Sequence, residues 1–294
     1  MTSLKEFKSR IHSVKETQKI TEAMQLISVT KLRRAKEAIQ NASSYQFHIK
    51  DFFMKCVVGE HFQEYPSPFV RGTGKDKVYL LVICTAEKGL CGGFNAQIIR
   101  FARDRIKEFI AEGKEIKLLI IGRKGYEGLR KEFSSMIIDS IELSSKKGVD
   151  FVQAHGIARQ ITSLFTSNVF DLCFFIYSEF KSIIQQIPII SKIIPVDWSQ
   201  DLEQKQQDIL SVYRYESTLY SVLDDIVLRS ISSRVFWIIL ENKASEVGAR
   251  ITAMDNATRN AGQMVDNLVL SYNRQRQMRI TTELIEIIAG AEVV

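Results

Sequence analysis

The chain has 294 residues, a formal net charge of +6 at pH 7, 45% hydrophobic residues and 25% charged residues, proportions that argue against intrinsic disorder. No apolar run approaches the ~18–20 residues that span a bilayer, so a transmembrane helix is not expected. The four cysteines form no CxxC pair and the four histidines are scattered, so buried free thiols are expected and neither a disulfide framework nor a metal site is indicated.

Residues 1–60 are predicted to form one long helix, because no proline or glycine occurs before Gly59. Its apolar residues begin a heptad seam with steps of three and four, at Leu4, Phe7, Ile11 and Val14. We expect the seam to continue less regularly through Ile20, Met24, Ile27, Ala35, Ala38, Ala42 and Tyr45. At 1.5 Å per residue, a helix from about residue 3 to about residue 57 is roughly 80 Å long.

This first segment is also strongly basic. Between Met1 and Lys36, nine lysines and arginines stand against three glutamates, an excess equal to the net charge of the whole chain. A basic helix of this kind suits nucleic acid, an acidic membrane surface or an acidic protein sleeve, and the plainer interpretation is a solvated face.

After a linker at residues 61–74, residues 75–200 alternate short apolar runs with helical patterns. Strands are predicted at residues 78–84, 117–121, 135–139, 171–177 and 186–194, and helices at about 95–112 and 149–165. This alternation predicts an α/β domain with a Rossmann-like, mostly parallel sheet.

Two glycine clusters in this region differ from phosphate-binding loops. Residues 89–95 read G-L-C-G-G-F-N, which is not the G-x-G-x-x-G spacing of dinucleotide-binding proteins. Residues 71–76 read R-G-T-G-K-D, with an aspartate where a hydroxyl should bind magnesium, and they precede a strand. Neighbouring Asp224 and Asp225 point to different sides of a helix. No catalytic residue, metal ligand or cofactor is therefore expected.

Residues 205–294 are predicted to form a second long helix, from about residue 208 to about residue 289. Its seam keeps three-four spacing through Ala244, Val247, Ile251, Met254, Thr258, Ala261, Val265, Leu268 and Tyr272. The helix would be roughly 120 Å long, far beyond the ~19 Å radius of gyration of a compact domain of this length. We therefore predict a long antiparallel coiled coil of the N- and C-terminal helices.

A polar run at residues 273–283 interrupts this seam and places Gln275 and Arg279 at seam positions. One interpretation is a solvated helix end. The other is a stretch that has lost its partner helix and is enclosed by another protein, in which case Arg276 and Gln277 could hydrogen-bond to partner carboxylates.

Six blocks of the sequence closely resemble the gamma subunit of F-type ATP synthases, of the bacterial type. They are residues 11–24, 31–35, 89–95, 244–261, 273–277 and 280–291. Three positions depart from the family pattern, since Glu87 and Lys88 replace Asp-Arg, and Ser217 replaces a proline. The absence of a leader before the first block favours a bacterial protein over an imported one.

The resemblance implies a non-catalytic rotor subunit of the central stalk. It would transmit rotation from the membrane c-ring to the catalytic beta subunits and so drive ATP synthesis coupled to proton transport. The implied partners are the alpha, beta, epsilon and c subunits in an alpha3 beta3 gamma delta epsilon assembly. Nucleic acid is not among them, and the membrane is reached only through the c-ring, at the cytoplasmic face of the bacterial inner membrane.

The resemblance also assigns contact residues. Those implied to contact alpha and beta are Met24, Arg250, Arg276, Gln277, Thr281 and Glu283. Tyr215 and Glu216 match positions near the c-ring and epsilon, and the replacement at Ser217 weakens that assignment. Two other classes of protein stay open on the residues alone. One is a basic coiled-coil scaffold or nucleic-acid-binding protein, and the other is an α/β enzyme with nucleotide bound at residues 89–93.

Overall fold

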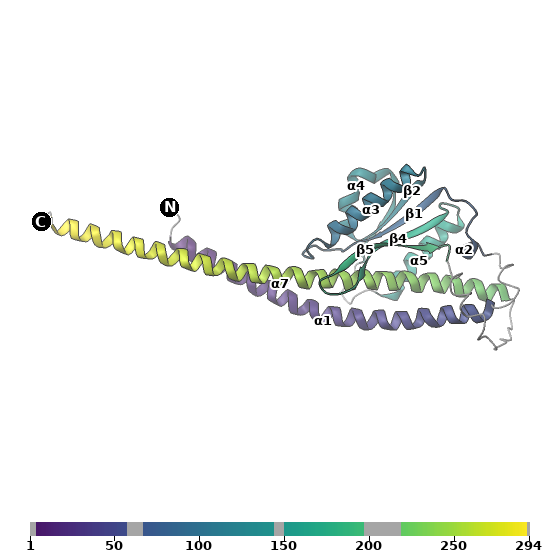
Figure 1. Ribbon diagram of the computed structural model, residues 1–294, viewed down its shortest axis with the longest axis horizontal. Helices are drawn as coiled ribbons and strands as arrows, with labels where there is room; N and C mark the ends of the chain where they lie inside the picture. The colour runs from purple at the N-terminus through teal and green to yellow at the C-terminus, as the bar shows by residue number, and fades with distance from the viewer. Residues whose placement is uncertain (1–3, 58–66, 144–149, 197–218, 293–294) are drawn as a thin grey trace. The chain divides into compact units, whose positions relative to one another are not determined.

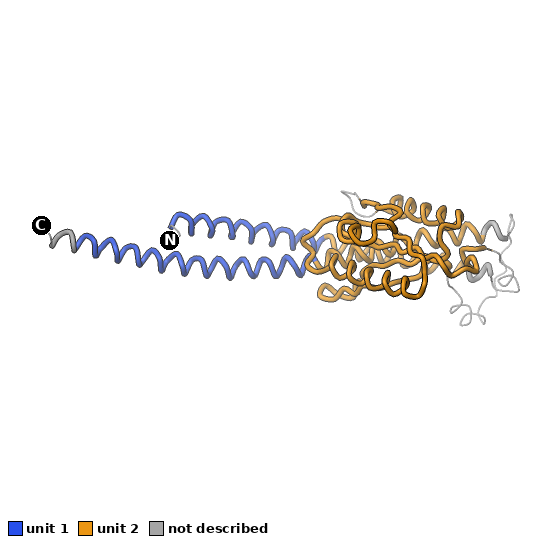
Figure 2. The backbone as a smooth tube through the Cα atoms, turned by 90° about the horizontal axis from the view of Figure 1, so that it is seen from above, with its two compact units in different colours: residues 1–30, 250–294 blue, residues 31–249 orange. Residues whose placement is uncertain are grey.

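The computed structural model of the chain describes residues 4–57, 67–143, 150–196 and 219–292. The chain divides into two compact units, as Figure 2 shows. The coil unit comprises residues 1–30 and 250–294, and the sheet unit comprises residues 31–249. Two long helices, α1 (Leu4–Val57) and α7 (Leu219–Glu292), contribute to both units. The expected start of the second helix near residue 208 lies outside the described residues.

The sheet unit contains a five-stranded sheet in the order β3-β2-β1-β4-β5. Its strands are β1 (Val78–Cys84), β2 (Glu115–Ile121), β3 (Ile137–Ile141), β4 (Leu172–Phe180) and β5 (Gln186–Ile194). Strand β1 pairs in parallel with β2 and β4, β2 pairs in parallel with β3, and β5 runs antiparallel to β4. The prediction of a mostly parallel sheet is confirmed, and β5 is reversed because a short hairpin joins it to β4.

Both faces of this sheet are covered by helices, which explains why β1 is apolar along almost its whole length. Helices α3 (Phe94–Ala111) and α4 (Arg123–Phe133) cover one face, and α5 (Phe151–Thr166) and the first part of α7 cover the other (Figure 1). Successive β1 side chains alternate between two cores, with Leu81 facing α3 and Leu80 and Val82 facing α5 and α7.

Three short elements were absent from the prediction: α2 (Pro68–Arg71), α4 and the 3-10 turn η1 (Ser134–Met136). Helix α4 contains Gly125 and Gly128, residues that normally lower helix propensity. Here they allow close packing, because a Cβ on Gly125 would lie 2.8 Å from Thr85 Oγ1 and one on Gly128 would lie 2.6 Å from Ile99 Cδ1. The helix is therefore specified by its tertiary contacts.

Helices α1 and α7 run antiparallel in both units. In the sheet unit, Trp237 Nε1 donates to Ser43 Oγ at 3.0 Å, and Gln46 Nε2 donates to the Ser233 carbonyl at 2.9 Å. In the coil unit, Lys8 Nζ lies 5.9 Å from the centre of the Tyr272 ring, and Thr21 pairs with Thr258. In each unit, residues with higher numbers on α1 contact residues with lower numbers on α7, so the predicted antiparallel pairing is confirmed.

The predicted seam of α7 is confirmed, since all nine of its members are buried or half-buried. The predicted seam of α1 is confirmed at its start, where Leu4, Phe7, Ile11 and Val14 are half-buried. It is also confirmed at Met24, Ala35, Ala38 and Ala42, which are half-buried or buried. The later choice of Ile20, Ile27 and Tyr45 was wrong, because their exposed fractions are 60%, 55% and 47%. The observed seam keeps strict three-four spacing and passes instead through Gln18, Thr21, Gln25, Ser28 and Leu32. Choosing seam positions by apolar character alone therefore misplaced these three residues.

Cys84, Cys91 and Cys173 are buried free thiols, as expected, and the side chain of Cys56 lies outside the described residues. Burial raises the pKa values of the Cys84 and Cys173 thiols far above the ordinary range, which leaves both groups uncharged. None of the helices over the described ranges is both long and apolar enough for a membrane span.

Asp171 ties the start of β4 to the start of β1. Its carboxylate accepts hydrogen bonds from the amides of Lys77 and Val78, both at 3.0 Å, and from the hydroxyl of Thr73 at 3.1 Å. Burial raises the pKa of this carboxyl, but the two amides, the hydroxyl and the charge of Lys75 together outweigh burial and lower it.

We expect Asp171→Asn to lose about 1–3 kcal/mol of unfolding free energy at pH 7, because an amide cannot accept all three bonds. The folded pKa lies below the ordinary 3.8, so the stabilisation is present above that value and is lost as the pH falls through the folded pKa. The difference between wild type and variant should therefore shrink at pH 3, which urea unfolding at the two pH values measures. Asp104→Asn, on the exposed side of α3, is the control. An equal difference at both pH values would contradict the prediction.

Candidate functional site

The carboxyl end of β1, where a Rossmann-type domain would bind phosphate, is filled by the chain's own side chains. Glu87 accepts hydrogen bonds from the amides of Arg123 at 3.1 Å and Leu143 at 2.6 Å. Thr85 Oγ1 accepts the amide of Gly125 at 2.8 Å. Because the first turn of α4 already donates to a carboxylate and a hydroxyl, its amides are not directed at a ligand.

Asn95 occupies the neighbouring turn, between β1 and α3. Its Oδ1 accepts the amide of Ala86 at 2.9 Å, and its Nδ2 donates to Cys91 Sγ at 3.2 Å. The glycine-rich loop is thus closed by internal bonds, which agrees with its interpretation as a structural strand-to-helix turn.

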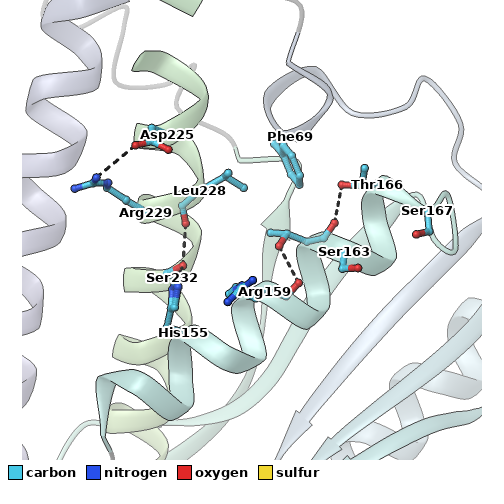
Figure 3. Close-up of a pocket in the computed structure, with 11 residues that line it drawn as sticks. Phe69, His155, Arg159, Ser163, Thr166, Ser167, Asp225, Leu228, Arg229 and Ser232 are labelled. Atoms are coloured by element: carbon cyan, nitrogen blue, oxygen red, sulfur yellow. Dashed lines mark hydrogen bonds and ion pairs between the residues drawn. The ribbon is translucent and has the colours of Figure 1, made fainter. Parts of the chain in front are cut away.

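A cavity of about 610 Å³ lies between α5 and α7 beside Phe69, as Figure 3 shows. Several of its polar side chains are bound to neighbouring groups: Arg229 pairs with Asp225 at 3.4 Å, and Ser232 Oγ donates to the Leu228 carbonyl at 2.9 Å. The hydroxyls of Thr162 and Thr166 likewise donate to backbone carbonyls of α5. His155 Nδ1 lies 3.2 Å from Ser232 Oγ, but that hydroxyl gives its proton to the helix, so the pair is no activated nucleophile. Over the described ranges, no group of three or more histidine, cysteine or acidic residues could hold a metal ion.

The C-terminal end of α7, in the coil unit, is the candidate interaction surface of this chain. Lys8 lies level with Tyr272, so Leu4, the first described residue of α1, lies level with about Arg276. From Arg276 to Ile288 every side chain is exposed, a stretch called the tip segment here. Its exposed residues include large apolar ones: Met278, Ile280, Leu284, Ile285, Ile287 and Ile288. An apolar helix surface without its partner helix is a surface for another protein.

Four of the predicted contact residues lie in the tip segment: Arg276, Gln277, Thr281 and Glu283. Thr281 Oγ1 donates to the Gln277 carbonyl at 2.9 Å, and Glu283 Oε1 pairs with Arg279 Nε at 2.8 Å. The Arg276 guanidinium has no hydrogen-bond or ionic partner among the residues that the structure describes. It is therefore free to bind an external acceptor.

Met24 and Arg250 lie elsewhere in the coil unit, where α1 and α7 are paired, and both are half-buried. Gln25 contacts Asp255, so Met24 lies some twenty residues, or about 30 Å along α7, from the level of Arg276. The predicted contact residues thus lie at separate levels of the coil and do not form one cluster. Tyr215 and Glu216 lie outside the described residues.

A polar layer inside the coil was missed by the sequence analysis. Thr21 Oγ1 and Thr258 Oγ1 are 2.7 Å apart, and Gln25 Nε2 donates to Asp255 Oδ1 at 3.2 Å. Polar seam residues fix the register of a coiled coil at some cost in stability, because other registers leave them unpaired. Extending the spacing from Val14 without regard to polarity would have identified both α1 residues.

The sequence comparisons decide the family. A family model described as ATP synthase matches residues 3–294. The ATP synthase gamma chain of Rhizobium etli is 48% identical over 292 residues, covering 99% of both chains, and that of Sinorhizobium fredii is 46% identical with the same coverage. The chain belongs to the ATP synthase gamma chain family. As a gamma chain it is the central-stalk rotor subunit of F-type ATP synthase and does not itself catalyse the reaction.

Solved structures share the gamma-chain fold. A central-stalk chain of the Tetrahymena thermophila mitochondrial ATP synthase aligns with a TM-score of 0.61 and 26% identity over 81% of this chain and 99% of that one. A rotor chain of the Euglena gracilis enzyme aligns with a TM-score of 0.65 over 94% of this chain, and at 17% identity it bears on the fold alone. The interpretation of residues 89–95 as a gamma-chain block, in place of a nucleotide-binding loop, is consistent with this family.

Proposed function

We propose that this gamma chain is the shaft that carries rotation between a membrane c-ring and the alpha and beta subunits, at the cytoplasmic face of a bacterial inner membrane. The observation that carries the proposal is the tip segment, where α7 continues beyond α1 and every side chain is exposed, including six large apolar ones. Such a surface suits a closed sleeve of other subunits and is unsuited to water.

The proposal keeps a functional division of the chain. Residues 1–60 and 205–294 are the two shaft helices, residues 61–74 are a linker, and residues 75–200 are the foot that meets the c-ring and epsilon. Tyr215 and Glu216 are proposed to contact the c-ring or epsilon on the strength of the family pattern alone.

The proposed contact to alpha and beta uses residues from both levels of the coil. Met24 and Arg250 would contact the sleeve from the paired region, and Arg276, Gln277, Thr281 and Glu283 from the tip segment. The unpaired Arg276 guanidinium suits a carboxylate of beta, because charge-assisted bonds are the stronger class of hydrogen bond. The basic excess of α1 adds complementarity to an acidic sleeve.

The mechanism follows from symmetry. A coil of two different helices has no threefold axis, so three identical beta subunits around it meet different side chains at any moment. Rotation of the coil exchanges these contacts and shifts each beta subunit among its conformations. The gamma chain in this scheme biases populations and forms no bond with substrate.

Affinity purification through a tag on the beta subunit of the native host tests the proposal. We expect this chain to be recovered at one copy for three each of alpha and beta, together with epsilon and delta, with ATPase activity in the eluate. Recovery of the alpha and beta subunits without this chain would overturn the proposal. Co-purification of the chain with nucleic acid, and no ATPase activity, would favour the basic coiled-coil scaffold instead.

A further inference from the structure

Strand β4 extends past the end of its neighbour β1. The parallel pairing of these strands stops at Ile83 and Ile176, whereas β4 continues to Phe180 with only β5 beside it. The backbone groups of β4 that would face β1 are therefore left without a strand partner from Ser178 onward. Buried backbone groups in this position require other hydrogen-bond partners.

Side chains of α7 supply partners for this open edge. Asn242 Oδ1 accepts the Ser178 amide at 3.1 Å, and Glu241 Oε2 accepts the Phe180 amide at 3.1 Å. Ser245 Oγ donates to the Ser178 carbonyl at 2.8 Å. The three side chains lie on one side of the helix, within about one turn, and all are buried. We call these three side chains the clamp.

The aromatic ring of Phe180, at the end of β4, also packs against the long helices. The Phe180 ring lies against Gly248 of α7, where a Cβ would come within 3.0 Å of Phe180 Cε2. On the α1 side, Lys36 Nζ lies 5.0 Å from the centre of that ring. Phe180 therefore contacts both long helices within the sheet unit, next to the clamp.

The clamp differs in kind from the rest of the contact between α7 and the sheet. Most of that contact is apolar, and because the hydrophobic effect is non-directional, it restricts the rotation of the helix about its own axis through shape alone. Hydrogen bonds to backbone atoms of a strand fix one rotation and one height. Burial raises the pKa of Glu241 and the bond from the Phe180 amide lowers it, so this carboxyl accepts a desolvation cost in order to satisfy that amide.

Resting on the proposed function, we propose that Glu241, Asn242 and Ser245 are positioning residues that form the torque-bearing joint between the foot and the shaft. Rotation of the sheet is passed to α7 at this joint. A chain without the clamp still folds and still fills the sleeve, but the shaft slips against the foot when it is loaded.

The test compares hydrolysis with proton pumping in inverted membrane vesicles from the native host. Glu241→Met with Ser245→Ala removes two clamp bonds at nearly constant volume. We expect ATP hydrolysis within twofold of wild type and at least threefold fewer protons pumped per ATP. Glu241→Gln keeps an acceptor oxygen and should couple like wild type.

Two results would overturn the proposal. One is normal proton pumping by the double variant. The other is a parallel fall of hydrolysis and pumping, which would indicate a purely structural role for the clamp. If the double variant does not assemble, Ser245→Ala alone is tested in the same assay, and we expect a smaller drop in the protons pumped per ATP. An unchanged number of protons pumped per ATP would contradict the proposed joint. Failure of the proposed function is distinguishable, because wild-type vesicles depleted of this chain would then still couple hydrolysis to pumping.

Discussion

Gly122→Ala should prevent stable folding. Gly122 follows β2 with φ of 100° and ψ of 132°, a region that side chains other than glycine rarely adopt. A Cβ there would lie 2.4 Å from the Thr85 carbonyl oxygen, which belongs to the backbone at the end of β1. The strain and the clash together should cost more than about 4 kcal/mol, a large part of the ~5–15 kcal/mol that stabilises a typical protein. Soluble yield and the midpoint of thermal unfolding are the measurements.

Gly113→Ala is the matched control for this variant. Gly113 also has a positive φ, of 78°, but a Cβ added there would meet no atom of the surrounding structure within 4 Å. Its substitution should cost only the left-handed penalty, about 1–2 kcal/mol. Equal stability of the two variants would show that the approach of Gly122 to Thr85 is not tight.

Arg276→Ala with Gln277→Ala should reduce ATP synthesis and hydrolysis by the assembled complex about tenfold or more, without changing the stability of the chain. Each lost contact to a partner carboxylate is worth about 1.5–3 kcal/mol if it is shielded from water, and about 1.4 kcal/mol corresponds to a tenfold change. Stability should stay constant because both side chains are exposed within the chain itself. Turnover of the purified complex and thermal unfolding of the chain are measured together.

Arg274→Ala controls for the loss of a positive charge near the same end of the helix. Arg274 is exposed and lies two residues before Arg276, about 200° around the helix, so it faces away from Arg276. It lies on the same side as Gln277 and therefore controls only for the lost positive charge. Its substitution should leave turnover within twofold of wild type. A similar loss from both variants would indicate a general electrostatic effect, and an unchanged double variant would remove Arg276 and Gln277 from the proposed contact.

The fold was predictable where hydrophobic periodicity and punctuation agree. Strands β1 and β5 were predicted with their observed bounds, and the seam of α7 was identified residue by residue. Prediction failed where tertiary contacts decide. Helix α4 depends on glycines that let it approach Thr85 and Ile99, and the α1 seam depends on Thr21 and Gln25 finding partners on α7. Neither partner can be inferred from a single segment.

The candidate site was predictable only in part for a similar reason. The interruption of the seam at residues 273–283 lies near the level of Leu4, the first described residue of α1. The clamp gave no comparable signal, because Glu241, Asn242 and Ser245 resemble ordinary helix residues until the open edge of β4 is placed beside them. An edge created by strands of unequal length is a property of the assembled sheet.

The two edge strands of the sheet affect whether the chain self-associates before it assembles with its partners. Strand β3 has only five residues, carries exposed Asp139 and has an irregular register with β2. Strand β5 carries Pro188 and exposed Lys192. Short length, charge, proline and irregularity at sheet edges all oppose pairing with the strands of other molecules. Newly made chains can thus wait at high concentration for assembly without joining edge to edge, so self-association should begin at the apolar tip segment and leave the sheet intact.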